Sequence, residues 1–111
     1  MAGKTDEVWL FEFDYTTELR VPLCPLNQKD LIIRCSVVIL EPFDGPGAHI
    51  SVGNGVSQAE YIFVTPNQIG QFESQEITQV AELENLVMTL DLKGSTVGRG
   101  FLLYKVKRYG E

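Results

Sequence analysis

The sequence contains few of the residues on which most catalytic and metal sites depend. Its 111 residues include one histidine, His49, and two cysteines, Cys24 and Cys35. The cysteine spacing matches neither a zinc motif nor a redox CxxC pair, and one histidine adds little to either. We expect two free thiols rather than a disulfide, because disulfides are rare in proteins made and kept in the cytoplasm. The composition predicts no metal ion and no cofactor.

Basic residues are also scarce. Nine Lys and Arg residues stand against fifteen Asp and Glu residues, which gives a formal net charge of -6. Proteins that bind nucleic acids contact phosphates through clustered Lys and Arg side chains. The one basic cluster, Lys105, Lys107 and Arg108, alternates with apolar Val106, as on the solvated face of a strand. We therefore expect no nucleic-acid partner.

Long apolar runs are absent as well. No run approaches the roughly 18–20 residues of a membrane-spanning helix. The first residues, MAGKTDEVW, are polar and carry Asp6 and Glu7, unlike a signal peptide. We expect no membrane partner, and synthesis in the cytoplasm without a signal peptide. The length predicts one domain over residues 8–111, preceded by a polar tail over residues 1–7.

Hydrophobic periodicity predicts β-strands along most of the chain. Residues 8–15 alternate between apolar and polar, the pattern of a strand with one buried face. Residues 31–41, LIIRCSVVILE, are rich in β-branched residues and are apolar on both faces except near Arg34 and Ser36. Such a strand lies in the middle of a sheet, covered on both sides, or passes from the core to a subunit contact.

Glycine and proline divide these strands. Asn54-Gly55 lies between alternating runs at residues 48–52 and 59–64, which predicts a β-hairpin. Residues 86–92 and 101–108 flank the glycine-rich segment KGSTVGRG and predict a second hairpin. The prolines of VPLCPLNQKD, at residues 21–30, predict a connection.

Two segments have less regular patterns. Thr65-Pro66 predicts one helical turn, with the threonine as N-cap and the proline as first helical residue. Residues 77–86 read either as the end of a weak strand or as a short helix. With about seven or eight short strands, the chain predicts an all-β fold, an antiparallel β-sandwich of jelly-roll type. A small closed barrel is the alternative.

No catalytic constellation is found in the sequence. The glycines at residues 53 and 55 lack both the GxxxxGK pattern of a phosphate loop and the following helix of a dinucleotide site. His49 and Ser51 share one strand face, but no GxSxG elbow accompanies them. A cupin-like metalloenzyme would need several histidines. We therefore expect no catalytic residues and a protein that is not an enzyme.

Two groups of residues are candidates for contacts with partners. One is a row of aromatic side chains on a single face of the first strand: Trp9, Phe11, Phe13 and Tyr15. This row has three interpretations, namely core packing, an interface with a neighbouring subunit, and a platform that stacks on sugar rings. The other group is polar and would contact a partner from loop tips: His49, Asn54 and Gln58.

Two segments of the chain resemble small bacteriophage virion proteins of β-sandwich fold. They are CSVVILEPFDGPGAHISVGN, from residue 35, and LVMTLDLKGSTVGRGFLLYKVKRY, from residue 86. The first combines a β-rich run with a Phe-Asp-Gly turn and a short apolar strand. The second is similar to their closing hairpin. The aromatic row lies outside both segments.

The resemblance implies a non-enzymatic structural component of the virion, made in the host cytoplasm. It implies a capsid decoration protein or a component of the tail or head–tail connection, commonly a homo-oligomer that packs on other virion proteins. The alternative hypothesis is a carbohydrate-binding module that recognises a host surface polysaccharide through exposed aromatic rings.

Overall fold

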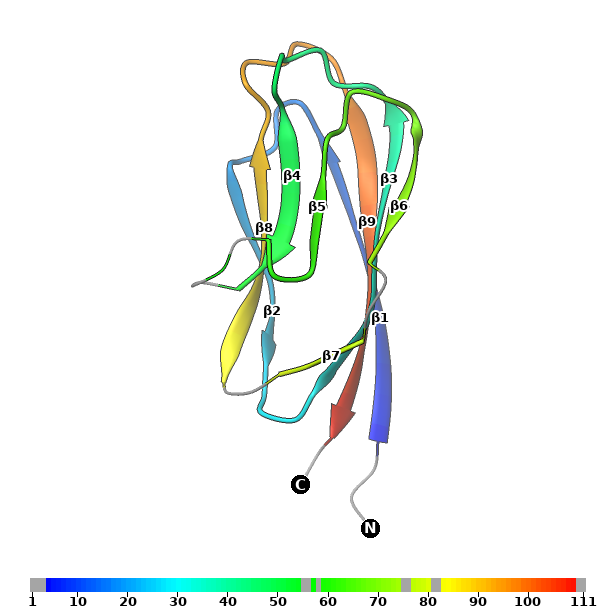
Figure 1. The fold of residues 1–111 in the computed structure, drawn as a ribbon, viewed down its shortest axis with the longest axis vertical. Helices are drawn as coiled ribbons and strands as arrows, with labels where there is room; N and C mark the ends of the chain where they lie inside the picture. Colours follow the sequence, from blue (N-terminus) through cyan, green and yellow to red (C-terminus); the bar gives the residue numbers. More distant parts are fainter. Residues whose placement is uncertain (1–3, 55–56, 58, 75–76, 81–82, 110–111) are drawn as a thin grey trace.

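A computed structural model describes residues 4–54, 57, 59–74, 77–80 and 83–109 of the chain (Figure 1). The described residues form nine β-strands and no helix. The strands are β1 (Lys4–Asp14), β2 (Arg20–Leu26), β3 (Leu31–Glu41), β4 (His49–Gly53), β5 (Ile62–Val64), β6 (Gly70–Glu73), β7 (Thr78–Gln79), β8 (Glu84–Asp91) and β9 (Arg99–Tyr109).

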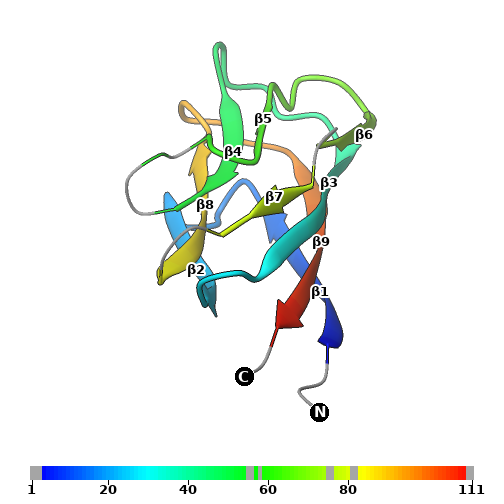
Figure 2. The same cartoon turned by 60° about the horizontal axis from the view of Figure 1, so that its bottom comes forward.

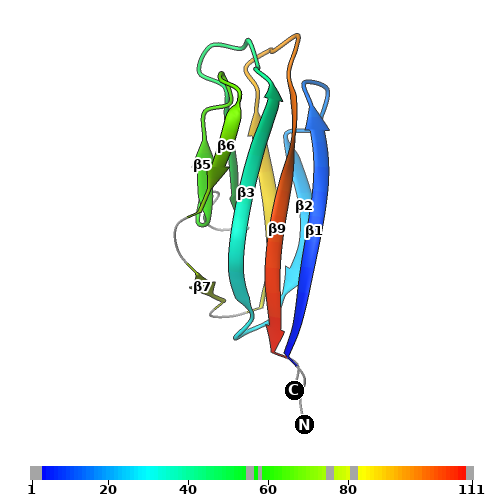
Figure 3. The ribbon, with the colours of Figure 1, turned by 90° about the vertical axis from the view of Figure 1, so that its right-hand side faces the viewer.

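The strands form two antiparallel sheets that face each other (Figures 1 and 2). One sheet has the order β1-β9-β3-β6, with short β7 also pairing with β3, and Figure 3 shows this sheet from its outer side. The other has the order β2-β8-β4-β5. The predicted antiparallel β-sandwich is confirmed.

The core lies between the two sheets and is built from the apolar face of each strand. Alternate residues of a strand point to opposite faces, so one apolar residue in two is enough to cover the inner side. Leu86, Met88 and Leu90 of β8 and Leu102 and Val106 of β9 are all buried in one cluster. Burial of each such side chain stabilises the fold by about 1.5–3 kcal/mol.

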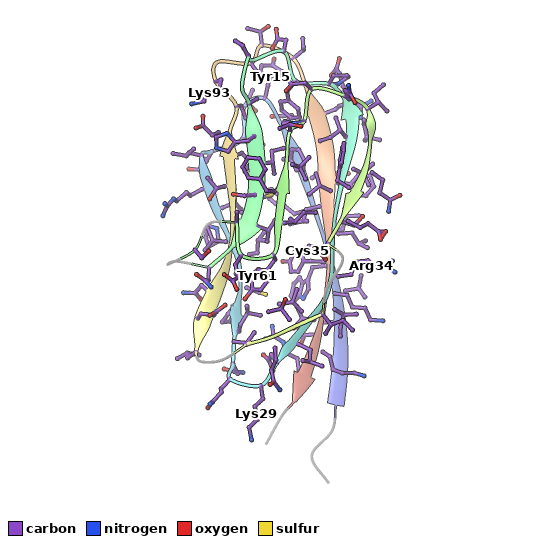
Figure 4. All side chains as sticks on the ribbon, viewed as in Figure 1. Tyr15, Lys29, Arg34, Cys35, Tyr61 and Lys93 are labelled. Atoms are coloured by element: carbon purple, nitrogen blue, oxygen red, sulfur yellow. The ribbon has the colours of Figure 1, made fainter. Side chains whose placement is uncertain are left out.

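Strand β3 lies in the middle of its sheet, between β9 on one side and β6 and β7 on the other, as predicted for residues 31–41. Cys35 and Val37 are buried, whereas Arg34 on the opposite face points away from the body (Figure 4). Cys24 and Cys35 are both free and buried. Burial raises the pKa of the Cys35 thiol to about 12, so this thiol stays protonated.

The structure corrects two predictions near the N-terminus. Strand β1 begins at Lys4, so residues 4–7 belong to a strand and not to a polar tail. Residues 20–26 form strand β2 although they include Pro22 and Pro25, which had predicted a connection. Strand β2 is at the edge of its sheet, where an N–H that faces outward needs no partner strand and a proline is tolerated.

The predicted hairpin over residues 86–108 is wrong. Strand β8 pairs with β2 and β4, whereas β9 pairs with β1 and β3 in the other sheet. The segment between them crosses from one sheet to the other. Ser95 holds this crossing: its hydroxyl donates to the carbonyl of Leu92 (2.7 Å) and accepts from the N–H of Gly45 (2.8 Å). An apolar face identifies a strand but does not identify its neighbour.

The predicted hairpin around residue 54 is confirmed in its pairing but wrong in its turn. Val52 of β4 pairs with Ile62 of β5, so the connection is much longer than two residues. The N–H of Asn54 donates to the carbonyl of Ser57 (3.0 Å), and that of Tyr61 donates to Val52 (3.0 Å). Gly55 lies outside the described residues.

The helical turn predicted at Thr65-Pro66 is not found. Residues 77–86 were predicted to be the end of a weak strand or a short helix, and within them Thr78–Gln79 form strand β7. The segment at residues 65–69 is a bend that docks on a neighbouring loop: Asn67 donates to the carbonyl of Phe43 (2.8 Å), and the N–H of Phe43 donates to Pro66 (3.0 Å). After β7, Val80 exchanges backbone hydrogen bonds with Lys29 and Asp30 (both 2.8 Å). These long-range bonds take the place of the local bonds of a helix.

Candidate interaction surfaces

The aromatic row of β1 runs from the core to the surface. Phe13 is buried and stacks on Phe43, with ring centroids 6.0 Å apart. Phe11 is half-buried against the core. Trp9 is 43% exposed although it stacks on Tyr104 at 6.3 Å, and Tyr15, in the turn after β1, is 46% exposed. Core packing therefore explains Phe13 and Phe11, while the two ends of the row remain accessible.

Beside Trp9, a cluster of charged groups holds β1, β9 and the start of β3 together. The Arg108 guanidinium donates to Glu7 (3.1 Å), to Asp30 (2.8 Å) and to the carbonyl of Pro25 (2.8 Å). Asp30 is only 1% exposed. A buried carboxylate without a cationic partner is strongly destabilising, so this pair has a structural role. Its groups are engaged with one another rather than turned toward a ligand.

The opposite face of the same strands carries apolar side chains that point to solvent. In the ladder, Leu10 of β1 is opposite Leu103 of β9, and Phe101 of β9 is opposite Val38 of β3. We call the following set the outer apolar face: Val8, Leu10, Val38, Leu40, Phe101 and Leu103. Leu10 is 56% exposed, and Val38, Phe101 and Leu103 are half-buried. Exposed apolar side chains that gather on neighbouring strands mark interaction surfaces.

The outer apolar face was not predicted, because only the odd-numbered residues of β1 were candidates for contacts with partners. The signal was present, since Val8 and Leu10 are apolar at positions that alternate with the aromatic row. The outer positions of residues 31–41 are apolar as well, and a subunit contact was one of the two interpretations of that strand.

One end of the outer apolar face opens into a hollow of about 430 Å³. Its lining includes Glu12, Asp14, Leu40 and Arg99. Gly100 also lines the hollow, and a Cβ at this position would lie 2.2 Å from the carbonyl oxygen of Val38. The hollow contains two carboxylates, which raises the question of acid–base chemistry.

The state of Asp14 argues against such chemistry. Its carboxylate accepts hydrogen bonds from the Thr16 hydroxyl and the Thr16 N–H, and these bonds lower its pKa. A general acid needs the opposite shift, toward neutral pH. The direction of this shift does not suit Asp14 to protonate a substrate.

The three polar candidates do not form one site. His49 is at the start of β4 and Asn54 follows its end, so about 16 Å of strand separates them. His49 is half-buried, stacks on Phe63 at 5.4 Å and lies 3.7 Å from the Asp91 carboxylate. Gln58 lies outside the described residues.

Asn54 belongs to a cluster that fixes its own loop. Its side chain accepts from the N–H of Ser57 (2.7 Å) and donates to Glu84 (3.3 Å). Tyr61 donates to the same carboxylate oxygen at 2.6 Å, and burial together with this carboxylate raises the Tyr61 pKa. Asn54 thus makes hydrogen bonds within the chain, and a contact of this residue with a partner stays a prediction.

Within residues 4–54, 57, 59–74, 77–80 and 83–109, no three His, Cys, Asp or Glu side chains gather where a metal ion could be held. Over the same residues, no helix is long and apolar enough to cross a membrane.

No family model and no curated protein matches the sequence. Among solved structures, the chain is similar to a chain of the acidic stable capsid structure of Helicobacter pylori bacteriophage KHP30. The TM-score is 0.76 at 12% sequence identity, over 99% of this chain and 95% of that one. It is also similar to a chain of the cyanophage Pam1 capsid asymmetric unit, with a TM-score of 0.68 at 11% identity, over 95% and 86% of the two chains.

These two likenesses extend over nearly the whole length of all three chains. At such low identities they show a shared fold. The resemblance to phage virion proteins of β-sandwich fold, inferred from two sequence segments, is therefore confirmed at the level of the fold.

Proposed function

We propose that this chain is a non-enzymatic structural protein of a bacteriophage particle, either a capsid decoration protein or a component of the tail or head–tail connection. It would form homo-oligomers and pack on other virion proteins. The outer apolar face is the observation that carries this proposal, because it exposes apolar side chains on three adjacent strands. The fold shared with chains of two phage capsid structures supports it.

The mechanism is burial of surface rather than turnover. A stable protein interface buries about 1,200–2,000 Å² in total, and apolar burial contributes roughly 25 cal/mol per Å². Charged side chains at the margins, such as Arg34 and Glu12, would set the orientation of the partner because opposite charges must meet. Arg34 already lies 3.9 Å from the carboxylate of Glu73.

The proposal is tested by substitutions that add a charge to one surface and not to the other. Leu40, 44% exposed at a bulge of β3, belongs to the outer apolar face, whereas Phe63, 58% exposed, lies on β5 of the other sheet. We expect Leu40→Asp to weaken self-association and binding to virions at least tenfold, and Phe63→Asp to leave both unchanged. Light scattering gives the mass in solution, and co-sedimentation gives particle binding.

Two results would count against this function. A wild-type protein that is monomeric and never sediments with virions contradicts the virion role. Equal effects of the two substitutions contradict the assignment of that role to the outer apolar face.

The exposed aromatic side chains favour the second candidate, a module that binds a host surface polysaccharide. Trp9 and Tyr15 are both more than two-fifths exposed, and aromatic rings stack on sugars. In this case the fluorescence of Trp9, the single tryptophan, shifts when polysaccharide is added and acrylamide quenches it freely. A Trp9 emission that polysaccharide leaves unchanged argues for the structural role.

A further inference from the structure

The edges of the two sheets differ in how well they are protected. An exposed edge strand offers unpaired N–H and C=O groups to any extended segment, and proteins usually blunt such edges with prolines, bulges or short strands. Edge strand β2 contains two prolines and a bulge, and β5, β6 and β7 have three, four and two residues. In contrast, β1 has eleven residues, no proline and an unbroken register with β9.

The hydrogen-bond pattern identifies the groups at the free edge of β1. Tyr15 donates its N–H to Gly98 and so continues the ladder between β1 and β9. In an antiparallel pair, alternate residues bond to the partner strand while the residues between them point away. Because Tyr15 bonds toward β9, the backbone groups of Val8, Leu10 and Glu12 face the free edge, beyond which the described residues contain no strand.

This edge ends at Asp14. The Asp14 N–H donates to the Thr17 hydroxyl (2.9 Å), and its carbonyl accepts from the Thr17 N–H (3.0 Å). The turn after β1 therefore closes the edge at that end and leaves the stretch before it open. The open stretch borders the outer apolar face, to which Val8 and Leu10 belong.

Charge indicates which strand fits this edge. The β1 sequence, KTDEVWLFEFD, carries one basic and four acidic residues, a net charge of -3. Its neighbour β9, RGFLLYKVKRY, carries four basic and no acidic residues around an apolar centre. The pairing includes an ion pair between Glu7 and Arg108 at 3.1 Å. A second copy of β1 would instead bring two acidic strands together, and like charges on adjacent strands repel.

We propose that the free edge of β1 accepts an extended strand from another virion protein, in which basic residues flank a centre of alternating apolar residues. Its backbone bonds to Val8, Leu10 and Glu12, and alternate side chains lie on the outer apolar face. The identity of the partner as a virion protein rests on the proposed function. The expected basic and apolar composition of the partner's strand rests on the charge of β1.

A proline substitution tests the contribution of the backbone edge separately from that of the side chains. Leu10→Pro removes an N–H that faces the free edge and leaves the ladder with β9 intact, because that N–H takes no part in it. Leu10→Ala keeps the N–H and shortens the side chain. On particles assembled without this protein, we expect Leu10→Pro to bind at least tenfold more weakly than Leu10→Ala, with both variants folded by circular dichroism.

A peptide probe tests the charge preference and does not depend on the proline variant folding. The probe is a synthetic peptide with the β9 sequence, and the control is the same peptide with its basic residues replaced by glutamate. We expect the basic peptide to slow amide hydrogen exchange at Val8, Leu10 and Glu12 of the wild-type protein. Exchange at Phe11, which bonds toward β9, stays unchanged.

The outcomes distinguish the two proposals. Wild-type protein that fails to bind particles contradicts the proposed function. If Leu10→Pro binds particles as tightly as the wild-type protein, the edge proposal is wrong. The same holds if both peptides slow exchange at these amides equally. Neither result contradicts the virion role. If the same amides become protected when the concentration of the protein alone is raised, a second copy of the chain binds the edge. The proposal that a strand of another virion protein binds there is then wrong.

Discussion

Gly98 shows how closely single residues constrain the end of the molecule opposite the termini. It has a φ of +135°, and an added Cβ would lie 2.4 Å from the ring of Phe43. Gly47 also has a positive φ, of +76°, but an added Cβ meets nothing within 4 Å. The two glycines therefore differ in packing, while both have a backbone conformation that disfavours other residues.

We expect Gly98→Ala to lower the free energy of unfolding by about 2–5 kcal/mol, because backbone strain and overpacking add. Gly47→Ala, which introduces strain alone, should cost about 1–2 kcal/mol. Urea unfolding of both variants measures the difference. Equal losses would show that the contact with Phe43 relaxes at little cost.

The Arg108 guanidinium donates to the buried carboxylate of Asp30 at 2.8 Å. We expect Arg108→Met to destabilise the protein by about 3–5 kcal/mol, because it removes a cationic partner from a buried carboxylate. Adding Asp30→Asn to this variant should restore part of the loss. Chemical unfolding of the single and double variants checks this. A double variant less stable than Arg108→Met would mean that Asp30 acts chiefly through its bond to the Asn27 N–H.

The carboxylate of Asp44 makes the stability of the protein at acidic pH depend on a contact between two loops. Hydrogen bonds from the Thr96 hydroxyl (2.8 Å) and the Thr96 N–H (2.7 Å) lower its pKa below the usual 3.8. A lowered pKa in the folded state adds stability above the pKa of the unfolded chain, and this stability is lost as the pH falls through the folded pKa.

We expect Thr96→Val to raise the pKa of Asp44 toward its usual value, as followed by NMR titration of the carboxyl carbon. Asp14, whose pKa is lowered by bonds from Thr16, is the internal control and should not move. If the pKa of Asp44 stays low in Thr96→Val, the backbone N–H groups hold the carboxylate without the hydroxyl.

At the scale of the element, β8 separates inward from outward residues clearly. Met88 is fully buried, and Val87 on the other face is half-buried. We expect Met88→Ala to cost about 2–5 kcal/mol, because it leaves a cavity between the sheets, and Val87→Ala to cost about 1 kcal/mol. Thermal and urea unfolding compare them. Similar losses of stability in the two variants would contradict the assignment of Met88 to the interior of the sandwich and Val87 to the outer face.

The positions of the longer strands could be predicted from the sequence because alternation is a local property. The predicted strands at residues 8–15 and 31–41 overlap β1 and β3, and the later alternating runs overlap β4, β5, β8 and β9, with ends that differ by up to four residues. Pairing is not local. The two strands of the expected closing hairpin have the same alternation whether they are neighbours or lie across the core, and only the fold decides between these arrangements.

The candidate surfaces could be predicted only in part for the same reason. The aromatic row was identified, but its division into buried Phe13 and exposed Trp9 depends on how far the second sheet extends over β1. The outer apolar face depends on three strands that are distant in sequence. The hydrogen bond from Asn54 to Glu84 could not be predicted, because the two residues are thirty positions apart in the sequence.

At the scale of the whole molecule, the two sheets differ in length. Strands β1, β3 and β9 have eleven residues each, whereas β2 and β8 of the other sheet have seven and eight. The molecule is accordingly elongated, with principal extents of 50 × 24 × 21 Å. The long sheet thus offers both the apolar face and the open edge along much of the length of the molecule.

Both ends of the chain leave the same pole, where Lys4 of β1 is paired with Tyr109 of β9 (Figures 1 and 3). A pull applied between the two ends would open the β1–β9 ladder one pair at a time, like a zipper. A pull between the C-terminus and the opposite pole, for example at Pro46, would load many backbone bonds in shear at once. We expect single-molecule stretching between the two chain ends to need clearly less force than stretching between the C-terminus and the opposite pole. The molecule therefore resists tension well only when the force acts between its two poles.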